Sequence, residues 1–294
     1  MKYQNLTTSI SAAVIVLVLT ACGGGAKSEK NADSSEFDKA KAELQDNVEK
    51  VLFEIPSPAE IPFILQASGA DYSEALINDI DNIDGYAAMN DKAVINLGIY
   101  STDIGYLSAY DKAQDALNYM RSCRKLADNL GLSDSFSSDL LDEFESNVES
   151  KDSLATLVNR TIADAEGILQ EDNRGDMAAL LITGGFVEGL YLATQIVDKY
   201  PNDEGLDASL RNMLLTDLIK TIMDQEEPLA DLIEMLKGVD QNETTASILK
   251  GLEAISASYS EIDMQASIES QTLSEETIKG VTESVAALRG DLVS

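Results

Sequence analysis

The chain offers few side chains for acid–base chemistry, because it contains no histidine. Ser-His-Asp triads, Cys-His pairs and histidine-based zinc sites are therefore excluded. Among the acidic residues Glu188 stands out, since it is the single charged residue in the otherwise apolar stretch 178–197. A carboxylate in such a stretch is costly to bury unless it is paired or protonated. We therefore expect Glu188 to have a polar partner.

Polar stripes on two predicted helices indicate where that partner lies. At about 100° per residue, Glu188, Tyr191 and Gln195 share one face of the helix predicted over residues 178–197. A second helix, predicted from about residue 91 to residue 130, places five polar side chains within about 40° of a common direction: Asn96, Tyr100, Asp103, Tyr110 and Gln114. We hypothesise that the two stripes face each other and that these eight residues bind a cationic or hydroxyl-bearing ligand in a polar cleft.

Two other interpretations of the stripes remain open. They also suit a sealed interior network of hydrogen bonds, in which case the protein is a structural scaffold. Alternatively, Asp103 and Glu188 are the two carboxyl groups of a helical glycoside hydrolase, which requires a separation of about 5 to 9.5 Å in an open cleft. Sugar sites usually also offer stacking aromatic rings, and the chain lacks tryptophan. We therefore expect a protein that is not an enzyme and predict no catalytic residue.

The elements that position these side chains are predicted to be helices throughout. From residue 37 onward apolar residues recur at helical spacing, as in the series Leu229, Leu232, Ile233, Leu236 and Val239. No β-hairpin signal interrupts this pattern. The sequence predicts an all-α fold, a single irregular bundle of about nine helices forming one domain over residues 37–294. The stretch 178–197 is long enough to span a membrane, but its glycines favour a buried central helix.

Charge excludes further classes of function. The chain has 294 residues, with 52 acidic against 21 basic side chains, and a formal net charge of −31. Nucleic-acid binding requires clustered Lys and Arg, and an anionic membrane surface would repel such a chain. The hydrophobic share of 44% is nevertheless sufficient for a folded core. No cofactor and no metal site is predicted, since Asp79, Asp81 and Asp84 do not match the ligand positions of an EF-hand.

The first residues have the pattern of an export signal. A basic Lys2 precedes the apolar run at residues 12–19, and the small residues Thr20 and Ala21 follow it. The sequence Leu19-Thr20-Ala21-Cys22 resembles the lipobox of bacterial lipoproteins. That resemblance implies that residues 1–21 are a signal peptide removed before Cys22, and that Cys22 carries fatty-acyl chains such as palmitate. Residues 22–36, rich in Gly, Ser and charge, are predicted to form a flexible tether.

The same resemblance implies a location and a general role. Several acyl chains, at about 0.8 kcal/mol per buried methylene, would hold the protein on a membrane durably. Gly23 follows the cysteine, where related proteins kept in the inner membrane commonly have aspartate, and this implies the outer membrane of a gram-negative envelope. The body resembles uncharacterised all-helical lipoproteins of that compartment. We expect a binding or interaction module for a partner protein or a small polar ligand; which membrane face it occupies is left open.

Two smaller features complete the predictions. Cys123 has the spacing of a core residue relative to Ala116, Met120, Ala127 and Leu130, and is predicted to be a small buried hydrophobe without a disulfide. The tripeptide Arg289-Gly290-Asp291 is interpreted as a helix end with a capping glycine.

Overall fold

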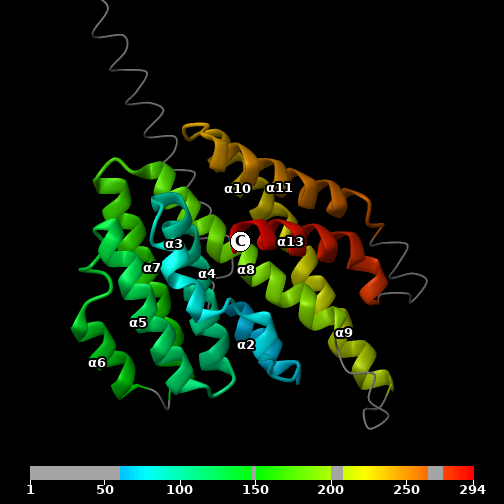
Figure 1. Ribbon diagram of the computed structural model, residues 1–294. Helices are drawn as coiled ribbons and strands as arrows, with labels where there is room; N and C mark the ends of the chain where they lie inside the picture. The colour runs from blue at the N-terminus through cyan, green and yellow to red at the C-terminus, as the bar shows by residue number, and fades with distance from the viewer. Residues whose placement is uncertain (1–59, 148–149, 200–207, 264–273) are drawn as a thin grey trace, which may run out of the picture. The chain divides into compact units, whose positions relative to one another are not determined.

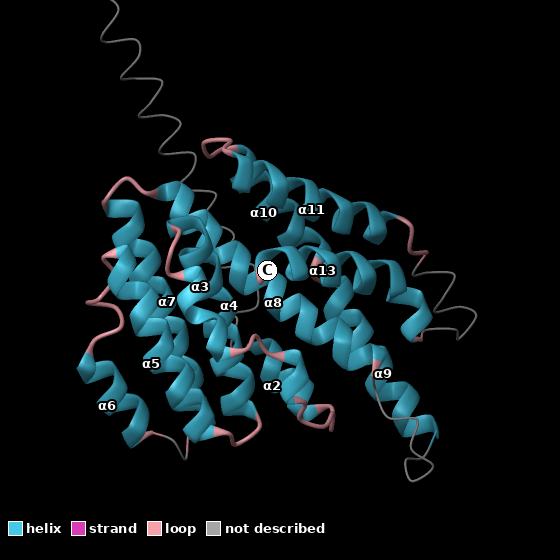
Figure 2. Ribbon diagram, viewed as in Figure 1, coloured by secondary structure: helices cyan, strands magenta, loops and turns pink. Residues whose placement is uncertain are grey.

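The computed structural model describes residues 60–147, 150–199, 208–263 and 274–294, all within the unit Ala40–Ser294. Helices form the regular structure of these residues, and no strand occurs among them (Figure 1, Figure 2). Ten of the described α-helices contain eight residues or more. The all-α prediction is therefore confirmed, and the helix number agrees with the expected nine or so. The predicted signal peptide, Cys22, the tether and residues 37–59 lie outside the described residues.

The α-helices follow one another along the described part of the chain. Their bounds are α2 Glu60–Ala67, α3 Ile83–Tyr86, α4 Asn90–Ala109, α5 Ala113–Leu130, α6 Ser138–Ser146, α7 Lys151–Glu171, α8 Gly175–Asp198, α9 Ala208–Met223, α10 Glu226–Lys237, α11 Glu243–Ser260 and α13 Lys279–Leu292. Single turns of 3₁₀-helix occur at Glu74–Leu76, Ile80–Asn82 and Glu275–Ile278.

Two helices, α4 and α8, form the centre of the bundle. Every residue of α4 from Ala93 to Ala109 is buried, and so is every residue of α8 from Met177 to Leu190. Helices α5 and α7 pack against α4, while α13 and α9 pack against α8 (Figure 1). Of the described helices, α8 is the one that is long and apolar enough to span a membrane, with a mean hydropathy of 1.5, yet 94% of that window is buried inside the protein. The prediction of a buried central helix is thus confirmed.

Glycines allow the two central helices to come unusually close. A Cβ atom added to Gly98 on α4 would lie 2.2 Å from the carbonyl oxygen of Leu181 on α8. A Cβ atom added to Gly184 would lie 2.1 Å from the carbonyl oxygen of Ile95. The hydroxyl of Thr102 on α4 donates a hydrogen bond to the carbonyl oxygen of Gly185, at 3.2 Å. Polar groups on these two helices are therefore held close together by backbone contact.

Residues with positive φ mark two helix ends, and one break was not predicted. Helix α5 ends at Leu130 and is capped by Gly131 with φ +72°, and α8 begins at Gly175, shortly after Asn173, whose φ is +60°. The helix expected from residue 91 to residue 130 is wrong, because the chain turns between Ala109 and Ala113 into two packed helices, α4 and α5. Asp111 takes a positive φ of 59° in that turn, a conformation that aspartate tolerates better than most residues.

Candidate functional site

The centre of the candidate site is an ion pair between α8 and α13. Glu188 is fully buried, and the side chain of Arg289 is 14% exposed. The guanidinium donates two hydrogen bonds to this carboxylate, from Nε to Oε2 at 3.0 Å and from an Nη atom to Oε1 at 3.1 Å. The same guanidinium lies over the ring of Tyr191, 4.7 Å from its centroid. Such a bidentate pair is the strong form of the arginine–carboxylate interaction, and it gives Glu188 its expected polar partner.

Asp103 adds a second carboxyl group to this pair. It is fully buried on α4, and its Oδ2 accepts a hydrogen bond from the backbone N–H of Asn78 at 3.1 Å. Burial raises the pKa of Asp103 well above its usual value, and the negative charge of Glu188 raises it further. The other oxygen of Asp103, Oδ1, accepts no hydrogen bond from a described residue. Because Arg289 stabilises the charged form of Glu188, we assign a proton to Asp103, which makes the three groups neutral together.

The proton on Asp103 makes stability depend on pH in a defined direction. The unfolded residue titrates near pH 4, whereas the folded pKa is raised. The stabilising contribution is therefore complete below about pH 4 and is lost as the pH rises through the raised folded pKa, by about 1.4 kcal/mol per pH unit. Asn at this position can still accept the hydrogen bond from the Asn78 backbone N–H and has no carboxyl proton to lose. We expect the gain in free energy of unfolding from Asp103→Asn to increase with pH when urea unfolding is measured at pH 5, 6 and 7.

A matched variant separates the pH-dependent effect of Asp103→Asn from the effect of lowering the net negative charge of the chain by one unit. Asp128 lies exposed on α5, so Asp128→Asn removes one negative charge without touching the buried pair. Its stability difference from the native chain should stay flat over the same pH range. If the difference in free energy of unfolding between Asp103→Asn and the native chain is also independent of pH, Asp103 carries no proton in the folded chain.

Hydrogen bonds extend the buried charged group into a larger network. Asn78 donates from Nδ2 to Oδ1 of Asn96 at 3.1 Å, and Asn96 donates to the carbonyl oxygen of Leu292 on α13 at 3.1 Å. The Tyr86 hydroxyl bonds to both Asn78 and the carbonyl oxygen of Val293, at 3.3 and 2.8 Å. The network therefore fastens the C-terminal end of α13 to α4 and to the segment before α3.

The structure brings together part of the predicted set of eight residues. Asn96, Tyr100, Asp103 and Glu188 are all buried at the junction of α4 and α8, with Tyr191 beside them under Arg289. The Tyr100 hydroxyl donates to the carbonyl oxygen of Asp79 at 2.7 Å, so it takes part in the same interior. Gln195 is half-buried farther along α8.

The remaining two predicted residues lie elsewhere. Tyr110 follows the last residue of α4 and packs with Tyr106 and Tyr72, with ring centroids 4.8 and 5.8 Å apart. Gln114 is exposed at the start of α5. Both were placed on the stripe by extending one helix through residue 130, and the turn at Asp111 invalidates that extension for them. The central residues are thus sealed, as a structural network requires.

Sequence reasoning missed Arg289 and Asn78. Arg289-Gly290-Asp291 lies in the last turn of α13, as expected for a helix end, but the capping role of the glycine is wrong, because the helix continues to Leu292 and its C-cap is Val293. A basic residue facing the apolar side of a helix, at the spacing of Val281, Val285 and Leu288, was the available signal. Asn78 gave no such signal, because it lies in an irregular segment.

The burial of Asp103 and Glu188 differs from what a glycoside hydrolase site requires. Asp103 and Glu188 are both fully buried, whereas a glycoside hydrolase needs two carboxyl groups flanking an open substrate site. No group of three or more acidic or cysteine side chains able to hold a metal occurs among the described residues. Cys123 is fully buried and forms no disulfide, as predicted, and burial raises the pKa of its thiol.

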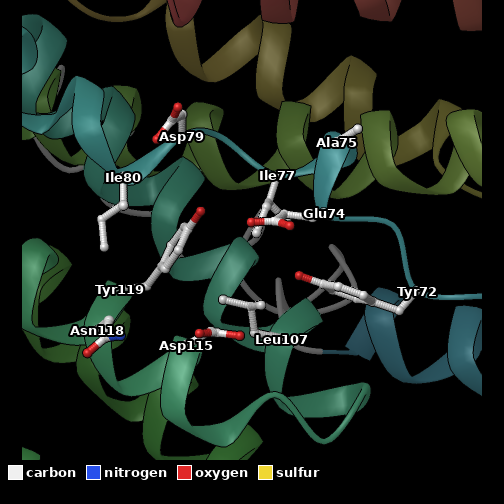
Figure 3. A pocket seen from close by; sticks show the side chains of 10 residues that line it. All are labelled: Tyr72, Glu74, Ala75, Ile77, Asp79, Ile80, Leu107, Asp115, Asn118 and Tyr119. Atoms are coloured by element: carbon white, nitrogen blue, oxygen red, sulfur yellow. The ribbon is translucent and has the colours of Figure 1, made fainter.

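Open space lies at the surface instead. One pocket, of about 410 Å³, lies between the segment 72–80 and α5, and Figure 3 shows the side chains that line it. Another, of about 550 Å³, lies near the start of α4 and the end of α13, beside Met89 and Leu292. Neither is lined by Asp103 or Glu188.

Similarity to other proteins does not add to these observations. No protein-family model, no curated protein and no solved structure matches this chain.

Proposed function

We propose that this chain is a lipid-anchored binding protein of the gram-negative outer membrane, attached through acyl chains on Cys22. The sequence Leu19-Thr20-Ala21-Cys22 supports the anchor. Cys123 forms no disulfide, which leaves the Cys22 thiol available for acylation. The net charge of −31 disfavours electrostatic attachment to an anionic bilayer, so a covalent lipid is the physically sufficient alternative.

One observation favours binding over catalysis. The two central carboxyl groups are used to join α4, α8 and α13, and Glu188 already has a bidentate cation. They are therefore not exposed to act on a substrate. A surface pocket of about 410 Å³ is within the usual size range of small-molecule sites, and it carries both polar and apolar side chains. We infer that the helical domain presents such a pocket to a small ligand while the lipid holds it on the membrane.

Replacing Cys22 tests the anchor. In the native host the wild-type chain should sediment with outer membranes, and mass spectrometry of its N-terminal peptide should show acyl mass on Cys22. Cys22→Ser should lose the acyl mass and leave the outer-membrane fraction, because each acyl chain contributes about 0.8 kcal/mol per buried methylene to attachment.

The second cysteine supplies the control. Cys123→Ala removes the buried thiol and should leave acylation and sedimentation unchanged. An unmodified thiol at Cys22 in the wild-type chain, or residues 1–21 still attached, would contradict the proposal.

A further inference from the structure

The pocket beside α5 has walls of two kinds. Its apolar part comes from Ala75, Ile77, Ile80 and Leu107, and its polar part includes the phenol groups of Tyr72 and Tyr119. Three acidic residues complete it, Glu74, Asp79 and Asp115, and no Lys or Arg is among its ten lining residues. An apolar cavity with a negative lining favours a ligand that has a hydrocarbon body and positive charge.

Two of these carboxylates lack cationic partners among the residues that the structure describes. In Figure 3 the carboxylates of Glu74 and Asp115 and the hydroxyl of Tyr72 border the same space. Among the described residues, neither Glu74 nor Asp115 forms a hydrogen bond or an ion pair through its side chain. Nearby surface carboxylates do have partners, since Asp84 pairs with Lys125 and Asp111 with Lys151. Neither Glu74 nor Asp115 is therefore paired with a cation in the described part of the chain.

Tyr72 responds to this negative field. Burial raises the pKa of Tyr72 to about 12, and the charges of Glu74 and Asp115 contribute to the rise. The hydroxyl thus stays protonated and is available to a ligand, because no hydrogen bond to it occurs among the described residues. An ammonium group is already found next to the pocket, where Lys112 Nζ lies 4.8 Å from the centre of the Tyr72 ring.

The spacing of the acids favours an organic cation over a metal ion. A metal needs several ligands that converge on one point, and no such group of acidic side chains occurs in the part of the chain that the structure describes. Here the carboxylates are distributed around a space of about 410 Å³. A ligand with two positive charges separated by methylene groups matches both the distributed acids and the apolar walls.

We propose that this pocket binds an aliphatic diamine, with its ammonium groups at Glu74 and Asp115 and its methylene chain against the partly exposed side chain of Ile77. This inference rests on the proposed binding role and adds the chemical class of the ligand. Each ammonium would gain an uncompensated carboxylate, and the chain would cover apolar surface of the pocket.

Calorimetric titration of the full-length chain in detergent, with 1,5-diaminopentane as the probe, tests the proposal. Binding should be at least about 10-fold tighter than that of the neutral analogue 1,5-pentanediol, because the diol lacks both charges. The double variant Glu74→Gln/Asp115→Asn should bind the diamine about 10-fold more weakly. Ala75→Leu, which narrows the pocket without changing its charge, should also weaken binding.

A matched double variant controls for net charge. Asp128→Asn/Glu234→Gln makes the same charge change at exposed positions outside the pocket, and Asp128 lies about 20 Å along α5 from Asp115. It should bind the diamine within about twofold of the native chain. Absence of diamine binding, or equal weakening by both double variants, would overturn the proposal. Either result would leave the lipid anchor standing if Cys22 carries acyl chains.

Discussion

Replacing Arg289 by alanine is expected to lower the free energy of unfolding by about 3 to 5 kcal/mol, the usual cost of removing one partner from a buried ion pair. Glu188 would stay fully buried among α4, α8 and α13 without its two charged hydrogen bonds. Its pKa, already raised by burial, would rise further, because the charge and hydrogen bonds of Arg289, which lower it, would be lost. The loss should therefore be larger at pH 8 than at pH 5, where Glu188 more readily takes up a proton. Urea unfolding at both pH values measures it.

Two variants identify the cause of that loss. Arg121→Ala removes an arginine whose pair with Glu145 is half-exposed, and it should cost less than about 1 kcal/mol. Adding Glu188→Gln to Arg289→Ala removes the buried charge, and should restore part of the stability and abolish the pH dependence of the loss. If Arg289→Ala proves no more costly than Arg121→Ala, Glu188 is not held by this pair in solution.

The sequence predicted the environment of Glu188 but not its partner. A carboxylate in an apolar stretch is costly to bury without a partner, and this cost can be judged from that stretch of sequence alone. The partner itself, Arg289, is 101 positions away and reaches Glu188 because α13 packs on α8. Helical periodicity indicates which face of α13 is buried, but it does not indicate which helix covers that face. The same limit applies to Asn78, which joins the network from an irregular segment.

Helix boundaries can be predicted from the sequence only where a residue such as glycine or proline marks them. The end of α5 has such a signal, because Gly131 caps the helix at positive φ, which glycine adopts at little cost. The break at Asp111 carries neither glycine nor proline, so continuous periodicity made residues 91–130 look like one helix. Asp103 was nonetheless placed correctly near Glu188, since it precedes the break. Tyr110 and Gln114 lie at the start of the break and beyond it, and they were placed incorrectly.

Replacing Gly184 by alanine is expected to destabilise the protein by about 3 kcal/mol, at the upper end of the cost of overpacking a core. The new Cβ would lie 2.1 Å from the Ile95 carbonyl oxygen, a backbone atom that no rotamer change can move away. Helices α4 and α8 would have to separate, which also stretches the bond from Thr102 to Gly185. The higher helix propensity of alanine, about 1 kcal/mol, offsets only part of this cost. Thermal and urea unfolding measure the difference.

Gly167 on α7 is the matched control, because a Cβ atom added there meets nothing within 4 Å. Gly167→Ala should be neutral or stabilise by up to about 1 kcal/mol. Gly98→Ala should resemble Gly184→Ala, since its Cβ would lie 2.2 Å from the Leu181 carbonyl oxygen. Once one alanine has pushed the helices apart, the second finds more space. The double variant should therefore lose less stability than the sum of the two single losses, by about 1 kcal/mol or more. Strict additivity would mean that the two glycines do not share one helix contact.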